Sequence, residues 1–389
     1  MDKFIDELPS YVDIIKSIKE TIITNIVLIG QIPCSTFKEK RRVNMFMERM
    51  SDASVDECRT DSYNNPIGII KGTSETKPPI FVVAHLDSFT EKNVDHNYMV
   101  KENTITGPGI LDNAIGVGVL ISLPEIIKKS NLSFESDIVL AGVIQSIGKG
   151  NLRGIRHLLK IWDSPIRGAI CLEGCELGRL NYYSDGMIRG EIECSISKFQ
   201  NRTNNFHPNA ILTLNEVINQ ILKIHLPQRP RSRIIFGKIS GGFKHGKTAY
   251  DARLGFEIQS DSDKMVKNIY TDIKDIVIGI SHEYDVELKL KTISNANASK
   301  LSYNHPLVKN AWAIMDQLNI KPVSEPSESE LSIFLSHKIP AITVGITRGS
   351  NYHLDNARME IEPMFKGIAQ IIGLLMAIDE GICDESQLA

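Results

Sequence analysis

Short apolar runs of strand length alternate with helical patterns along the first part of the chain. The strands are expected at 79–87, 137–144 and 167–174, and the helices at 8–29, 36–50, 111–129 and 151–162. Thr36 and Glu39 have the spacing of a capping box at the start of the second helix. This alternation predicts an α/β layer with a mostly parallel central sheet flanked by helices.

The period changes after residue 187. Strands with one polar face are expected at 187–197, 232–240, 249–260 and 284–293, and amphipathic helices at 209–224 and 263–280. The order β-α-β-β-α-β predicts a compact two-layer unit. The α/β pattern then resumes with a helix at 305–318, a strand at 340–346 and a helix at 362–379. We therefore expect one discontinuous α/β domain, formed by 1–187 and 298–389, that carries an inserted domain at 188–297.

Composition narrows the class of protein. The chain has 389 residues, a formal net charge of −3 and a sequence pI near 6.4, so no basic field favours nucleic acid or anionic membrane. The most apolar early segment, 22–32, is too short to span a bilayer. The six cysteines have no framework spacing, which is typical of a reducing compartment. A cytoplasmic protein without nucleic-acid or membrane partners is expected.

Acidic residues and histidines follow the predicted parallel strands. They are His85 and Asp87 after the first strand, Asp112 in a glycine-rich turn, Glu173 after the third strand and His353 after 340–346. Because α/β folds build their sites at the carboxyl ends of strands, these side chains are expected to meet. Imidazole and carboxylate ligands suit zinc or another divalent metal, and Asp87 would hold the tautomer of His85.

Each of these residues also has a purely structural interpretation. His85 alone is typical of a strand-end histidine with a satisfied hydrogen bond, and Asp112 of a helix N-cap. Cys171 and Cys175 lack the two-residue spacing of thiolate ligands, which favours buried, inert thiols. Four candidate ligands at corresponding strand ends are harder to explain by structure alone, so the sequence predicts a metal site.

The motifs together resemble one family. AHLDSF, GPGILDNAIGVGVL, CLEG and KIPAITVGI followed by YHLDN are similar to motifs of the dizinc amidohydrolases and exopeptidases. That family includes carboxypeptidase G, peptidase T, aminoacylase and succinyl-diaminopimelate desuccinylase. The resemblance extends from about residue 30 to residue 380, and it implies that the inserted domain is a lid through which two copies dimerise.

The resemblance also implies roles for the candidate residues. His85, Asp112 and Glu173 would hold the first metal, with Asp87 orienting His85. Asp112 would bridge to a second metal, which His353 and a glutamate would complete. In the family this glutamate is the second of a Glu-Glu pair, and the first is the general base.

The chain departs from the family pattern at that pair. One alignment of GKGNLRG places the pair on Ser146 and Ile147, and a shift by one places it on Gln145 and Ser146. Neither register contains a carboxylate. Glu176, one turn beyond Glu173, is the candidate surrogate base that the sequence offers.

Substrate-binding positions depart as well. The lid histidine is replaced by Gln200, the arginine that would bind a substrate carboxylate by Gln259, and the S-T-D turn by SESE at 327–330. With fewer ligands at the second position, one firmly bound zinc and a weak second site are expected.

Two hypotheses follow. The first is a zinc-dependent exopeptidase or amidohydrolase of reduced or redirected activity, a homodimer that acts on a peptide or an N-acyl amino acid. The second is a catalytically inactive homologue that acts as a binding or dimerisation partner. The four ligands favour the first hypothesis, and the missing Glu-Glu pair favours the second.

Overall fold

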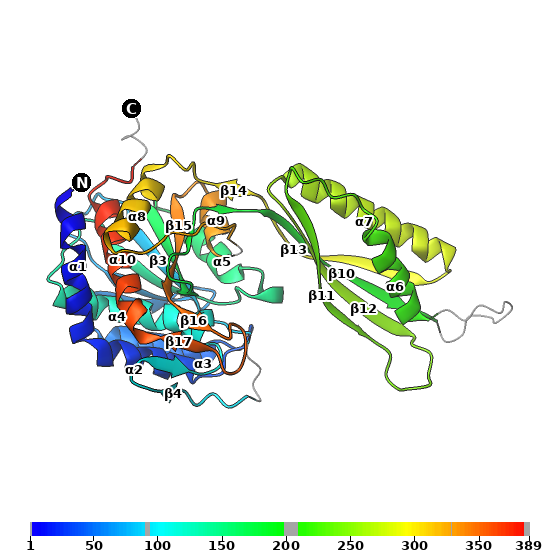
Figure 1. Ribbon diagram of the computed structural model, residues 1–389, viewed down its shortest axis with the longest axis horizontal. Helices are drawn as coiled ribbons and strands as arrows, with labels where there is room; N and C mark the ends of the chain where they lie inside the picture. The colour runs from blue at the N-terminus through cyan, green and yellow to red at the C-terminus, as the bar shows by residue number, and fades with distance from the viewer. Residues whose placement is uncertain (1, 90–93, 198–208, 328, 385–389) are drawn as a thin grey trace. The chain divides into compact units, whose positions relative to one another are not determined.

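The computed structural model describes residues 2–89, 94–197, 209–327 and 329–384. The chain forms two compact units, one made of Met1–Tyr183 with Lys300–Ala389 and the other of Ser184–Ser299 (Figure 1). The predicted α/β class, with a mostly parallel sheet and an inserted β-α-β-β-α-β unit, is confirmed.

A seven-stranded sheet forms the centre of the first unit, in the order β1-β2-β6-β3-β7-β15-β8. Its strands are β1 (Glu57–Thr60), β2 (Pro66–Ile70), β3 (Ile80–His85), β6 (Ile138–Val143), β7 (Gly168–Cys175), β8 (Leu180–Asn181) and β15 (Ala341–Thr347). The four central strands β6, β3, β7 and β15 are parallel, and the outer strands are antiparallel to their neighbours. The central strands are buried throughout, as expected of parallel strands covered on both faces.

Helices cover both faces of this sheet (Figure 1). They are α1 (Asp2–Ser17), α2 (Lys19–Gly30), α3 (Lys40–Asp52), α4 (Ile115–Lys129), α5 (Arg153–Ile161), α8 (Pro306–Gln317), α9 (Leu331–Ser336) and α10 (Ile361–Asp379). Alternate residues of β3 enter two separate apolar cores. Val82 packs in the larger core with α1, α2, α4 and α10, whereas Phe81 and Val83 pack in a smaller core with α5 and α9.

Two helical segments of the first unit are long and apolar enough to cross a bilayer by composition alone. They are Ile110–Lys129 and Ile361–Asp379, and 94% and 78% of their apolar windows are buried inside the structure. Both are therefore core helices that present little apolar surface to a membrane.

Three local predictions differ from the structure. The helix expected at 8–29 is two helices, because Ile18 has a non-helical conformation between α1 and α2. The capping box at Thr36 is wrong, since α3 begins at Lys40 without a side-chain cap. The antiparallel strands β1 and β2 and the short helix α9 were not predicted, because segments of four to six residues carry too little periodicity.

Small strands form two further sheets, separate from the seven-stranded sheet. β4 (Met99–Val100), β5 (Thr104–Thr106), β16 (Gly349–Ser350) and β17 (Arg358–Glu360) form one sheet, and β9 (Tyr183–Ser184) pairs with β14 (Ser299–Lys300). Because β17 pairs with both β16 and β5, the turn that carries His353 is attached to the segment that leads into Asp112.

The inserted unit is a four-stranded antiparallel sheet covered by two helices. Its elements are β10 (Gly186–Ser195), α6 (Ala210–Ile221), β11 (Ser232–Gly241), β12 (Asp251–Ser260), α7 (Asp263–Glu283) and β13 (Glu287–Ala296). The sheet order is β11-β12-β10-β13. Asn209 and Ser262 cap the two helices with their side chains, and the apolar core lies between helices and sheet.

Candidate metal centre

His85 is the last residue of β3, and its ring is held at both nitrogens. Nδ1 lies 2.9 Å from the main-chain oxygen of Asp87, and since a carbonyl can only accept, Nδ1 carries the proton. Nε2 then faces Asp112, 3.1 Å from Oδ1. The Asp87 carboxylate is 3.8 Å from Nδ1, so the backbone carbonyl of residue 87, rather than its side chain, provides the close contact that orients the imidazole.

Asp112 lies between two histidines. Its segment, the π-helical turn η1 (Ile110–Ala114), departs from helical geometry at residues 112 and 113. Oδ1 lies 3.1 Å from Nε2 of His85, and Oδ2 lies 3.1 Å from Nε2 of His353. The N-cap position of α4 is Ala114, so the interpretation of Asp112 as a helix cap is wrong.

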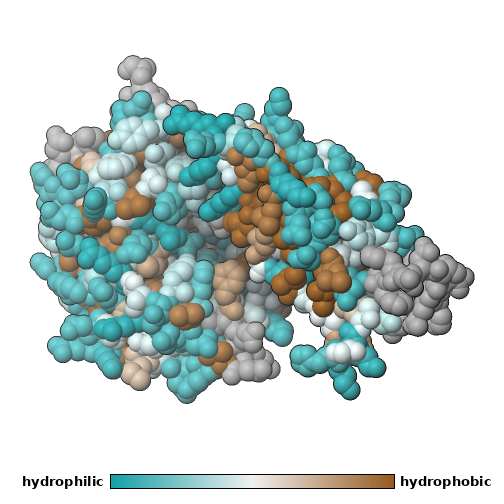
Figure 2. All heavy atoms as spheres, turned by 45° about the vertical axis from the view of Figure 1, so that its right-hand side comes forward, coloured by the Kyte–Doolittle hydropathy of each residue, from teal (hydrophilic) through white to brown (hydrophobic). Residues whose placement is uncertain are grey.

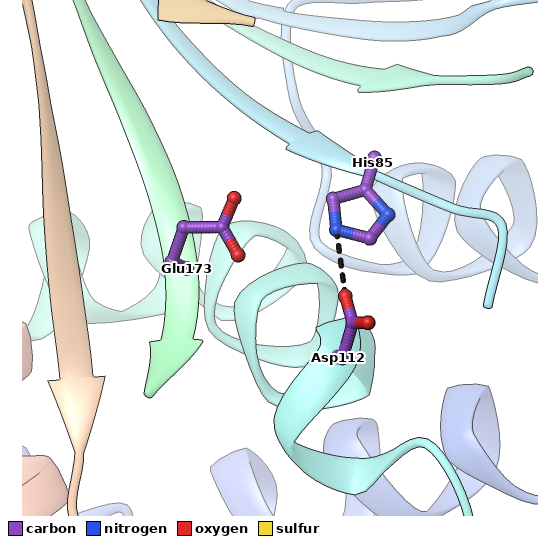
Figure 3. Close-up of side chains that lie close together, drawn as sticks. All are labelled: His85, Asp112 and Glu173. Atoms are coloured by element: carbon purple, nitrogen blue, oxygen red, sulfur yellow. Dashed lines mark ion pairs between the residues drawn. The ribbon is translucent and has the colours of Figure 1, made fainter. Parts of the chain in front are cut away.

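Close packing of η1 against β7 brings Glu173 beside Asp112. The side-chain amide of Asn113 donates to the carbonyl of Leu172 at 2.8 Å, and a Cβ added at Gly174 would lie 2.4 Å from Leu111 O. The ligand atoms of His85, Asp112 and Glu173 all lie within 4.8 Å of one another. Figure 3 shows these three side chains converging from β3, η1 and β7.

Burial and mutual charge shift the pKa values of this cluster. Burial would lower the pKa of His85, but the hydrogen bond and charge of Asp112 and other carboxylates raise it well above its usual value. Burial would raise the pKa of Asp112, but hydrogen bonds from His353 and His85 hold it below its usual value. Burial raises the pKa of Glu173 to about 7, because the opposing charges of His85 and Arg179 are not sufficient.

His353 reaches the cluster from the surface. It lies in the turn between β16 and β17 with a left-handed backbone (φ 64°), and its side chain is 48% exposed. The ring packs edge-on against Phe89, with centroids 5.0 Å apart. The imidazole is therefore positioned by a turn and an aromatic neighbour rather than by a strand.

The donor set fits a divalent cation. Two imidazole nitrogens and two carboxylates are the ligand types that zinc prefers, and Asp112 presents one oxygen to each imidazole as a bridging ligand would. The thiols do not belong to this set, because Cys171 and Cys175 are free and outside the cluster. Burial raises the pKa of Cys175 to about 11, which is consistent with an inert thiol.

The Asp87 carboxylate holds the segment after β6. Oδ1 accepts from the backbone N–H of Ser146 at 3.1 Å, and Oδ2 accepts from the N–H of Ile147 at 2.9 Å and from the hydroxyl of Thr36 at 2.8 Å. Asp87 is fully buried. Its side chain therefore positions the segment in which the family has its Glu-Glu pair.

Gln145 and Ser146, at which the two alignments start the Glu-Glu pair, have different partners in the structure. The Gln145 side chain accepts from the Tyr63 hydroxyl at 2.9 Å, and its N–H donates to Glu39 at 3.0 Å. The Ser146 hydroxyl donates to the Glu330 carboxylate at 2.6 Å. Gln145 is thus engaged with Tyr63, whereas Ser146 contacts a buried acid.

Glu330 was not predicted as a site residue. It ends the SESE stretch, directly precedes α9 and is 2% exposed. Its charge helps to raise the pKa of both His85 and Glu173. Glu176, the surrogate base suggested by the sequence, is exposed, and its side chain contacts the thiol of Cys175. The sequence did contain a signal for Glu330. It is the acidic residue that ends SESE, and the S-T-D turn of the family motif also ends in an acidic residue.

Gln200 and Gln259 both belong to the inserted unit, and the structure describes Gln259. Gln259 is buried on β12, where its amide accepts from Arg233 and donates to Glu257. Gln200 lies outside the described residues. Gln259 is therefore a neutral side chain whose amide is hydrogen-bonded to its neighbours in the sheet.

One family model matches part of this chain. The model of Peptidase family M28 matches residues 65–145. This range covers less than half of the chain and includes His85 and Asp112. No curated protein sequence matches the chain.

Solved structures match it over nearly its whole length. The dipeptidase Dug1p from Saccharomyces cerevisiae is 13% identical, with a TM-score of 0.78, and the match covers 96% of this chain and 99% of that one. A tripeptidase from Staphylococcus aureus is 16% identical, with a TM-score of 0.74 and coverage of 93% and 99%. A dinuclear metal-binding peptidase of the M20 family from Bacillus subtilis is 12% identical, with a TM-score of 0.65 and coverage of 94% and 99%. The resemblance to the dizinc peptidases is confirmed at the level of the fold.

Removal of the Asp87 carboxylate tests its role in holding the segment after β6. Asp87→Ala should lower the free energy of unfolding by roughly 3 kcal/mol, because it leaves two backbone N–H groups without their charged acceptor. Thr36→Val removes one of the three hydrogen bonds and should cost less. Urea denaturation with a chelator present would measure both without a contribution from bound metal. Equal losses in the two variants would contradict the role of the backbone hydrogen bonds.

Proposed function

We propose that a chain with this fold and this donor set is a metal-dependent hydrolase of peptide or N-acyl amide bonds. The observation that carries the proposal is the Asp112 carboxylate, which faces His85 with one oxygen and His353 with the other, beside the buried Glu173. The similarity in fold to a dipeptidase and a tripeptidase supports a peptide-like substrate.

His85, Asp112 and Glu173 would hold one ion, zinc in the first instance, and Asp112 and His353 would offer a second position. A bound divalent ion would supply Lewis acidity, which polarises the scissile carbonyl and makes water a stronger acid. The chain's own contribution is to hold His85, Asp112 and Glu173 together as a buried cluster beside His353. There, the carbonyl of Asp87 orients His85, and its carboxylate orients the neighbouring segment.

The proposed activity is reduced or redirected relative to ordinary exopeptidases. Gln259 cannot pair with a terminal carboxylate as an arginine does, and its amide already bonds to Arg233 and Glu257. Substrates whose binding depends on an ion pair between their terminal carboxylate and an arginine should therefore bind poorly. The absence of a carboxylate at 145–147 supports the alternative, a catalytically inactive homologue that acts as a binding partner.

The inserted unit is the proposed dimer interface. Among the described residues, β11 is an edge strand paired on one side only. Figure 2 shows apolar side chains gathered on the inserted unit. Exposed apolar residues on or next to α6 and on β11 are Ile211, Leu212, Leu222, Ile235 and Ile239. An open edge with apolar neighbours favours pairing with a second copy. Six free thiols are consistent with the proposed cytoplasmic location.

Light scattering tests the homodimer. The full chain at micromolar concentration should have twice the monomer mass of 43.4 kDa, and Leu212→Glu with Ile239→Glu should shift it to monomer by burying charge in the interface. The matched control is the charged surface variant Lys274→Glu. A monomeric wild type would contradict the interface.

Metal content tests the centre. The first position has three ligands and the second has two among the predicted residues, so elemental analysis after dialysis should give about one equivalent of zinc per chain. His85→Ala should abolish binding, because it removes a buried ligand. His353→Ala should matter less, and His245→Ala, in the inserted unit, should have no effect. Two equivalents retained through dialysis would show that a further side chain completes the second position.

Hydrolysis tests the function directly. The zinc-loaded protein should cleave members of a panel of dipeptides, tripeptides, peptide amides and N-acyl amino acids. Its rate should fall furthest below the rate of exopeptidases that have the arginine when the substrate has a free terminal carboxylate. A chelator should abolish turnover and zinc should restore it. A protein that binds zinc but cleaves no member of the panel would favour the inactive alternative.

A further inference from the structure

A buried glutamate meets the segment that lacks its Glu-Glu pair. The hydroxyl of Ser146, at the position where one alignment places the family's general base, donates to Oε1 of Glu330 at 2.6 Å. These two residues are 184 positions apart in the chain. Both side chains are buried, and Ser146 is itself held by the Asp87 carboxylate through its backbone N–H. A carboxylate therefore stands next to position 146, although the chain has none at that position.

The Glu330 carboxylate also lies within electrostatic reach of the ligand cluster. Its charge contributes to the raised pKa of His85 on β3 and of Glu173 on β7. The backbone of Glu330 is fixed by α9, since its carbonyl accepts from the N–H groups of Ile333 and Phe334, and Phe334 is fully buried in the smaller core. The acid is thus presented to the centre by a rigid element.

A structural role does not account for the charge at this position. Among the described residues, no lysine or arginine forms an ion pair with Glu330, and Ser146 is its hydrogen-bonding side-chain partner. A buried carboxylate without a directly paired lysine or arginine is costly, and the positive group that its charge favours is His85 of the ligand cluster. A glutamine would accept the hydroxyl of Ser146 equally well at lower cost. The negative charge therefore points to chemistry in the adjacent centre.

We infer that Glu330 is the general base of this site, taking over from a different segment the task of the missing glutamate, with Ser146 as its positioning residue. The inference rests on the proposed function. Glu330 takes a proton from water as the water oxygen bonds to the amide carbonyl carbon. When the carbon–nitrogen bond breaks, Glu330 returns this proton to the leaving nitrogen, so the products are a carboxylic acid and an amine.

The isosteric variant Glu330→Gln separates the charge from the hydrogen bond. In the zinc-loaded protein it should lower kcat by about 10²–10⁴-fold, the usual contribution of a general base. Its zinc equivalents should stay at the wild-type value and its midpoint of thermal unfolding should not fall, because the amide oxygen still accepts from Ser146 and the buried charge is removed. Glu325→Gln, an exposed acid in the same loop, is the matched control and should leave all three quantities unchanged.

Transfer of the carboxylate to the family position gives a gain-of-function test. Glu330→Ser should be as inactive as Glu330→Gln, and adding Ser146→Glu should raise kcat at least roughly tenfold above it, since one carboxylate again serves the site. Without metal, Ser146→Ala should lower the unfolding midpoint by roughly 2–4 °C, because it leaves Glu330 without its donor.

Three outcomes would overturn the inference. If the wild type is active and Glu330→Gln keeps kcat within about threefold of it, the loss is far smaller than the loss expected for a general base. Glu330 would then not be the base, but the proposed function would stand. Loss of zinc together with activity in Glu330→Gln would make Glu330 a ligand rather than a base. A zinc-loaded wild type without activity on any substrate would overturn both the function and this role.

Discussion

The shared carboxylate of Asp112 is the interaction on which the rest of the site depends. It faces two imidazoles with its two oxygens, and both contacts measure 3.1 Å. Because the carboxylate is buried, its charge needs these partners or a cation to offset the cost of desolvation. His85 at the end of β3, Glu173 on β7 and His353 in the turn after β16 accordingly lie around Asp112, at the carboxyl edge of the parallel strands.

The backbone around Asp112 explains how this arrangement is held. The segment η1 leaves helical geometry at Asp112 and Asn113, and the amide of Asn113 ties it to β7 beside Glu173. Gly174 permits this close approach, since a larger residue would meet the carbonyl of Leu111. The same contacts that complete the core of the first unit thus place three buried polar groups together. Asp112 and Glu173 raise the pKa of His85, and His85 lowers the pKa of both carboxylates against the effect of burial.

A second group of acids organises the segment after β6. Asp87 accepts two backbone N–H groups there, Glu39 accepts a third from Gln145, and Glu330 accepts the hydroxyl of Ser146. In the family pattern this segment would itself carry two carboxylates. Here, acids from three other segments surround it. Negative charge next to the candidate metal centre is therefore supplied by neighbours in space, which is the physical basis for the proposal that Glu330 is the base.

The sequence alone determined the properties that depend on local pattern. Apolar runs predicted the parallel strands, the change of period predicted the inserted unit, and the positions of His85, Asp112 and Glu173 after strands predicted that they would meet, as they do. Short elements such as β1, β2 and α9 escaped prediction because their periodicity is too brief. Only the tertiary structure decided that Asp87 orients His85 through its carbonyl and that Gln145 faces Tyr63. It also decided that Glu330 meets Ser146, because chain folding sets contacts between distant segments and no local pattern records them.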